Sequence, residues 1–121
     1  MMQWVGEEGL SQEFRDLVDF VYPSVGALLQ QCYVKVIFST WGNPPKRLQY
    51  IGVYSPGDAL PTMQLQKSKL RRVAQIIGLQ DVVCINATRI VRDPMSKLRT
   101  SDPRFWLELQ WIISQSDSGL N

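Results

Sequence analysis

The chain has 121 residues, of which 45% are hydrophobic and 20% charged, and it contains two cysteines and no histidine. This composition indicates one globular domain with its own core, and it excludes a disordered chain and a small fold held together by disulfides. Without histidine, the commonest general base and metal ligand is missing, so we expect a protein that is not an enzyme and has no metal or other cofactor.

The sequence gives no sign of a membrane or secretory segment. No apolar run approaches the ~20 residues that a membrane-spanning helix needs, and the first residues do not have the pattern of a secretory signal. We therefore expect a cytoplasmic protein in which Cys32 and Cys84 remain buried thiols.

The charge is distributed unevenly along the chain. Residues 35–104 carry twelve Lys and Arg and only four Asp, an excess of eight positive charges, although the whole chain has a net charge of +2. The segments before and after this stretch are acidic. Such an asymmetry is an argument about partners rather than about the fold, and it points to an anionic partner.

The first quarter of the chain has helical spacing. After an expected flexible lead-in over residues 1–9, apolar side chains recur from Leu10 to Val21 at intervals that form one helical stripe. Pro23 must end or kink this helix, and a short second helical piece is predicted over residues 24–31.

The period then changes to two. Residues 33–40 are rich in β-branched and aromatic side chains, residues 41–47 form a loop with Gly and two Pro, and residues 48–54 resume as a strand. The simplest arrangement of these two strands is an antiparallel hairpin.

The second half repeats this plan in outline. A helix is predicted from residue 62 to residue 77, a strand over residues 82–91, a polar loop with two Asp-Pro turns, and a strand over residues 105–113. We therefore expect an α+β fold in helix-hairpin-helix-hairpin order, with a four-stranded antiparallel sheet and two helices on one face. It would form a single domain over residues 10–114, followed by a flexible tail over residues 115–121.

The predicted helix over residues 62–77 carries four cations that no nearby acid pairs. They are Lys67, Lys69, Arg71 and Arg72, and no acid lies between Asp58 and Asp81. An ordinary solvated face usually mixes both signs of charge and gains from pairs one turn apart. An ordinary solvated face remains one interpretation, and a surface for an anionic partner is the other.

The two predicted hairpin loops repeat this pattern of cations beside aromatic residues. The first holds Trp41, Lys46 and Arg47, and the second holds Arg92, Lys97 and Arg99. Cations bind phosphates with release of counterions, and exposed rings stack on unpaired bases. Trp41 could stack in this way, or it could simply cap the edge of the sheet.

These patterns favour a non-enzymatic module that binds RNA or single-stranded DNA and acts as a homodimer. The contacts would be mostly to phosphates, so the sequence specificity would be low. The alternative is a protein-interaction or assembly subunit, homo-oligomeric, which docks on an acidic protein or on an anionic membrane surface.

Overall fold

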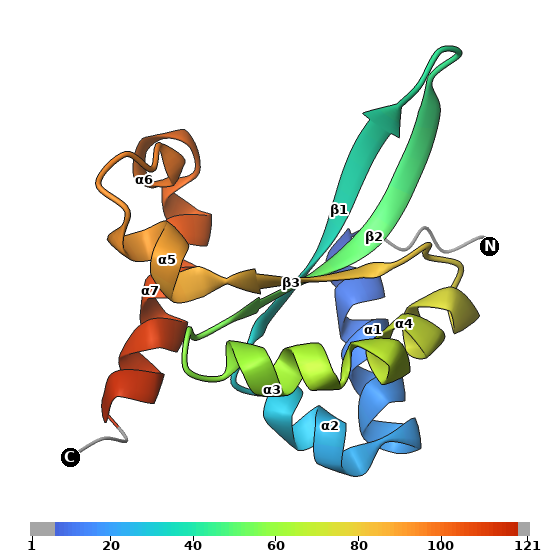
Figure 1. Ribbon diagram of the computed structural model, residues 1–121, viewed down its shortest axis with the longest axis horizontal. Helices are drawn as coiled ribbons and strands as arrows, with labels where there is room; N and C mark the ends of the chain where they lie inside the picture. The colour runs from blue at the N-terminus through green and yellow to red at the C-terminus, as the bar shows by residue number, and fades with distance from the viewer. Residues whose placement is uncertain (1–6, 119–121) are drawn as a thin grey trace.

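A three-stranded sheet organises the molecule, with helices on both of its faces (Figure 1). The elements follow in the order α1 (Glu7–Val21), α2 (Pro23–Leu29), β1 (Tyr33–Trp41), β2 (Lys46–Ser55), α3 (Leu60–Leu65), α4 (Lys67–Ile76), β3 (Val82–Asn86), α5 (Ala87–Arg92), α6 (Leu98–Ser101) and α7 (Pro103–Ser118).

The computed structural model describes residues 7–118. Of the expected flexible lead-in and tail, residues 1–6 and 119–121 lie outside the described residues, and the remainder belongs to α1 and α7. Between residues 7 and 118, no helix is both long enough and apolar enough to cross a membrane.

The sheet is mixed. β1 and β2 form the predicted antiparallel hairpin, paired from Tyr33 with Tyr54 to Trp41 with Lys46. β3 then pairs in parallel with β2, with Ile51 opposite Val82. β2 is therefore the central strand, and α3 and α4 form the connection that a parallel pair requires.

One face of the sheet packs against the helices α1 to α4. Alternate side chains of the strands point to this side, as Val34 and Val36 do in β1 and Ile51 and Val53 do in β2. Pro23 separates α1 from α2, as the sequence predicts, because its ring has no amide hydrogen to continue a helix. The buried residues of this cluster are Phe14, Val18, Val25, Leu29, Cys32, Val34, Val36, Ile51, Val53, Met63, Leu70, Val73, Ala74, Leu79 and Val82.

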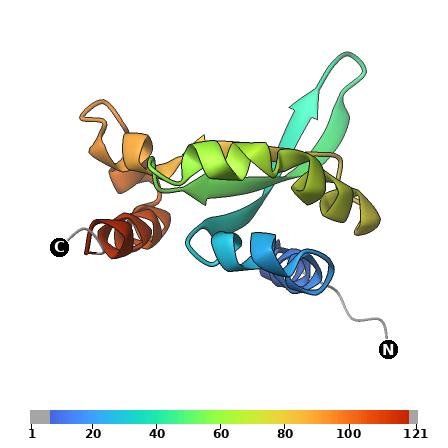
Figure 2. The ribbon, with the colours of Figure 1, turned by 60° about the horizontal axis from the view of Figure 1, so that its bottom comes forward.

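The other face packs against α5 and α7. The ring of Phe105 lies with its centre 5.3 Å from that of Tyr33 and 5.0 Å from that of Tyr54, and it stands nearly perpendicular to Tyr54. Leu109 and Ile113 complete this smaller cluster. Figure 2 shows α7 on a different side of the strands from α3 and α4.

The α+β class is confirmed, but the predicted four-stranded antiparallel sheet with two helices on one face is wrong. The described residues contain seven helices and three strands, and the predicted fourth strand, residues 105–113, is part of helix α7. Its buried residues Phe105, Leu109 and Ile112 follow helical spacing. The amide of Phe105 donates to Oδ1 of Asp102 at 3.3 Å, and Pro103 occupies the first helical position.

The predicted third strand is too long. β3 ends at Asn86, whose side-chain oxygen accepts a hydrogen bond from the amide of Arg89 at 3.0 Å and so caps helix α5. The β-branched residues that follow, such as Ile90 and Val91, pack on the α7 side of the sheet as part of this short helix. The cap outweighs the β propensity of residues 87–91.

Candidate nucleic-acid interface

Helix α4 turns its cations outward because its apolar residues are needed inside. Leu70, Val73 and Ala74 are buried against the sheet. The 3.6-residue period then leaves Lys69, Arg71 and Arg72 exposed, with Lys67 half-buried at the start of the helix. The sequence thus places four cations on one short helix.

Arg71 has a partner within the fold. Its Nε lies 2.8 Å from Oδ1 of Asp81, which also accepts a hydrogen bond from the amide of Val82 at 2.7 Å. Slight burial tends to raise the pKa of Asp81, but these two hydrogen bonds outweigh it and hold the pKa below its ordinary value. Arg71 is therefore less available to a ligand than Lys69 and Arg72, which are exposed on the same helix.

Lys69 and Arg72 line a hollow of about 330 Å³ together with Ser68 and Tyr22. Nζ of Lys69 lies 5.6 Å from the centre of the Tyr22 ring, where the face of the ring attracts a cation. The hollow contains two cations, a hydroxyl and a phenol, and none of its lining residues between residues 9 and 115 is a carboxylate. Among the described residues, neither cation forms an ion pair. This set of groups suits a phosphate beside an aromatic ring.

The hairpin tip brings a second set of cations and rings together. Trp41 is 67% exposed, and the strand register places it opposite Lys46. On the other face of the hairpin, the guanidinium carbon of Arg47 lies 4.6 Å from the centre of the Phe38 ring. Gly42 allows the tight turn between them because its φ of 84° is strained for any residue with a Cβ. The tip extends away from the body of the molecule (Figure 1).

The remaining predicted site residues lie elsewhere. Arg92 ends α5, Lys97 precedes α6, and Arg99 in α6 lies with its guanidinium carbon 5.2 Å from the centre of the Trp106 ring. Helices α5 and α6 lie at one end of the longest axis, whereas α4 and the hairpin lie toward the other (Figures 1 and 2). The fold brings Lys67 to Arg72 together and separates them from Arg92, Lys97 and Arg99.

Sequence reasoning missed Tyr22 and Ser68. Tyr22 follows α1, more than forty residues before α4, and reaches the basic helix only because α1 packs against α4. Ser68 stands among the cations in the sequence, but the pattern gives no sign that it lines a hollow.

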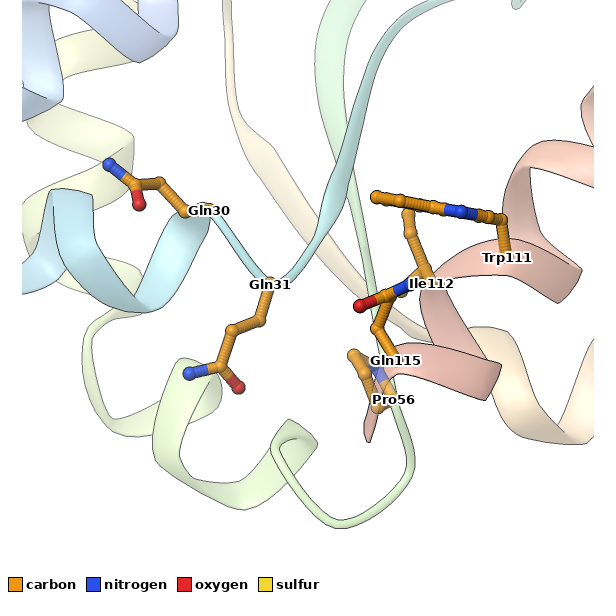
Figure 3. A pocket seen from close by; sticks show the side chains of 6 residues that line it. All are labelled: Gln30, Gln31, Pro56, Trp111, Ile112 and Gln115. Carbon is orange, nitrogen blue, oxygen red and sulfur yellow. The ribbon is translucent and has the colours of Figure 1, made fainter. Parts of the chain in front are cut away.

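A second hollow, also of about 330 Å³, is neutral and lies between the end of α2 and α7. Figure 3 shows Gln31 and Gln115 on opposite sides of it, with the indole of Trp111 extending over Ile112 and Gln115. Gln30 and Pro56 complete the lining, and none of the lining residues that the structure describes is ionisable.

The ionisable groups offer little for metal binding. No cluster of three or more His, Cys, Asp or Glu that could hold a metal ion is found over residues 7–118. Cys32 and Cys84 are free thiols, and burial raises the pKa of both.

The sequence and the structure were also compared with known proteins. No protein family, no curated protein and no solved structure matches this chain.

Proposed function

We propose that the protein is a non-enzymatic binding module for RNA or single-stranded DNA, with helix α4 as its main contact surface. The observation that carries this proposal is the hollow of Tyr22, Ser68, Lys69 and Arg72, which places two cations beside an aromatic ring and includes no carboxylate of the described side chains. The hairpin tip adds Trp41, Lys46 and Arg47 as a second contact.

The chemistry of both places fits a flexible single strand better than a rigid duplex. Lys69 and Arg72 bind phosphates, and Tyr22 or Trp41 offers a ring on which an unpaired base stacks. Contacts of this kind do not distinguish one base from another, so the binding would have low sequence specificity and a strong dependence on salt.

The test is a salt titration of a fluorescently labelled oligothymidine and of an oligouridine, measured by anisotropy. Replacing Lys69 and Arg72 together by Ala removes two phosphate contacts, so the slope of log K against log salt should fall by about 1.4, at about 0.7 per contact for a single strand. The matched control replaces Arg89 and Lys97 by Ala, which removes the same charge near the other end of the molecule and should leave most of the slope.

Two results would contradict the proposal. One is an absence of binding to either oligonucleotide at low salt. The other is an equal loss of slope in both double variants, because only the total charge would then matter. Trp41→Ala tests the hairpin tip separately. If a base stacks on Trp41, this replacement should weaken binding by about 1–3 kcal/mol.

An assembly subunit is the second candidate function. Leu107 and Trp111 lie one turn apart on α7 and are 60% and 64% exposed, which is unusual for large apolar side chains on a solvated helix. Sedimentation velocity over a hundredfold range of concentration tests this candidate. A homo-oligomer that dissociates when Leu107 and Trp111 are both replaced by Ser supports it, and a single monomeric species at all concentrations excludes it.

A further inference from the structure

The hollow between the end of α2 and α7 combines an exposed aromatic ring with side-chain amides (Figure 3). Trp111 is 64% exposed, whereas Ile112 and Pro56 contribute buried apolar surface to the lining. Gln31 lies across the hollow from Trp111 (Figure 3). A volume of about 330 Å³, with apolar and aromatic walls and a few polar groups, is typical of a site for a small planar molecule.

The side-chain amide of Gln31 is available to such a molecule. Gln31 is exposed, and no hydrogen bond of its side chain is found among the described residues. The amide carries an acceptor oxygen and donor hydrogens side by side. Nucleobases present a donor and an acceptor next to each other on their edges, and Gln pairs with adenine through two such hydrogen bonds. The amide and the ring together therefore fit a nucleobase.

This hollow and the basic hollow of α4 lie at the two ends of helix α2. Tyr22 is the N-cap residue of α2 and lines the basic hollow, and Gln30 is the C-cap residue and lines the other. At 1.5 Å per residue, these two positions are about 12 Å apart, which is roughly three to four nucleotides at ~3.4 Å each. Between them, the exposed side chains of Ser24 and Ala27 are small and leave room for a strand that runs along α2.

We propose that the hollow between α2 and α7 is a base-binding site, in which an unpaired nucleobase stacks on Trp111 and pairs with the amide of Gln31. This inference rests on the proposed function, because the phosphates of the same strand would bind Lys69 and Arg72 at the other end of α2. The amide can rotate to exchange its donor and its acceptor, so the site accepts any base, and the larger purines stack best.

A second copy of the chain that docks on α7 would also cover Trp111. Such a contact would use Leu107, which is 60% exposed one turn before Trp111 but does not line the hollow. A base instead needs Gln31, which lies across the hollow from α7 (Figure 3). The two occupants therefore make opposite demands on Leu107 and Gln31, and the amide favours the base.

The first test measures the binding of a short labelled oligoadenylate by anisotropy. Trp111→Ala should weaken binding about five- to 150-fold, which is the loss of one stacked base. The slope of log K against log salt should stay the same, because stacking releases no counterions. Trp111→Phe should recover most of the affinity, and the exposed control Leu107→Ala should bind as the wild type does.

The hydrogen bonds are tested at Gln31. Gln31→Met keeps the length of the side chain but removes its donor and its acceptor, so the oligoadenylate should bind at least threefold more weakly. Gln110→Met is the matched control, because Gln110 is exposed on α7 and does not line the hollow.

The second test uses adenosine, which has no phosphate to bind the cations of α4. Its titration should give a saturable shift of the indole Nε1–H signal of Trp111 in nuclear magnetic resonance spectra. The dissociation constant should rise at least threefold in Gln31→Met and stay unchanged when Lys69 and Arg72 are both replaced by Ala.

Two outcomes would overturn the inference and leave the proposed function intact. One is full affinity for the oligoadenylate in Trp111→Ala while the variant without Lys69 and Arg72 loses salt dependence. The other is a Trp111 signal that responds to protein concentration but not to adenosine, because a second copy would then cover the ring. An absence of oligonucleotide binding at low salt would instead remove the proposed function. The adenosine titration then still decides, since a saturable shift supports the base site and no shift overturns it.

Discussion

Gly26 of helix α2 is buried against Asp19 of helix α1. A Cβ atom at this position would overlap the carboxylate of Asp19 and lie 2.9 Å from its Cα. The carboxylate can rotate away, but the backbone of α1 cannot move without loosening the packing of Phe14 and Val18. The replacement Gly26→Ala therefore has two opposing effects on stability: the higher helix propensity of Ala stabilises α2, and the overlap with α1 destabilises the packing.

The two effects can be compared in magnitude. Ala stabilises a helix interior by about 1 kcal/mol relative to Gly, whereas overpacking a dense core costs about 1–3 kcal/mol. Because backbone as well as side-chain atoms are displaced, we take the upper part of that range. The expected net loss is then about 1–2 kcal/mol in the free energy of unfolding.

Urea unfolding followed by circular dichroism measures this loss. With a slope of about 2 kcal/mol per molar urea, the midpoint should fall by roughly 0.5–1 M. Ala27→Gly at the neighbouring exposed position is the matched control, and it should lose only the propensity difference of about 1 kcal/mol. A midpoint that rises in Gly26→Ala would refute the close approach of α1 and α2.

Three further predictions follow from single residues. Leu109→Ala should lower the free energy of unfolding in urea by about 2–5 kcal/mol, because Leu109 is fully buried. The exposed control Leu107→Ala should lower it by less than about 0.5 kcal/mol. Equal losses would mean that residues 105–113 form a strand. Asp81→Asn should cost up to about 1 kcal/mol at pH 7, as an exposed pair does, and progressively less as the pH falls below 3.8. The folded pKa of Asp81 is lowered, so its contribution is present above the ordinary value of 3.8 and is lost as the pH falls through the folded value. Cys32 should react with iodoacetamide at pH 8 at least a hundredfold more slowly in the native than in the unfolded protein, because burial raises the pKa of its thiol and shields it from the reagent. Mass spectrometry measures the labelling, and fast labelling of the native protein would contradict this prediction.

The elements that the sequence predicts well have unambiguous local signals. Pro23 interrupts a clear helical stripe, and the alternation over residues 33–40 is compatible only with a strand. The Gly and Pro residues of the loop then leave the two strands no simpler arrangement than a hairpin. In this half of the chain, local preference and tertiary packing agree.

Helix α7 shows why the prediction from sequence is wrong for the second half of the chain. Seven of the nine residues from 105 to 113 are apolar, so the segment satisfies a period of two as well as a period of 3.6. The signal that resolves the ambiguity is the pair Asp102 and Pro103, which form a helix cap and a first helical position. Treating them as an ordinary turn converts a helix into a strand, and a mixed three-stranded sheet into an antiparallel four-stranded one.

The candidate site divides in the same way. The four cations of α4 can be predicted from the sequence alone. Their outward direction can be predicted too, because the apolar stripe of the helix takes the inward face. The contribution of Tyr22 to the hollow cannot be predicted from the sequence, because it depends on how α1 packs against α4. The ion pair of Arg71 with Asp81 is likewise a tertiary contact, across the turn that follows α4.

The position of α7 at the end of the element order has a consequence for synthesis on the ribosome. The strands β1, β2 and β3 are complete at residue 86, but the face that carries Tyr33, Tyr54 and Ile85 stays uncovered until residues 87–118 have been made. At about 5–20 residues per second, that takes roughly 2–6 s. During this interval the nascent chain exposes a β-rich apolar surface, so slower translation of the codons for residues 87–118 should increase aggregation and the demand for chaperones, even though the finished protein is unchanged.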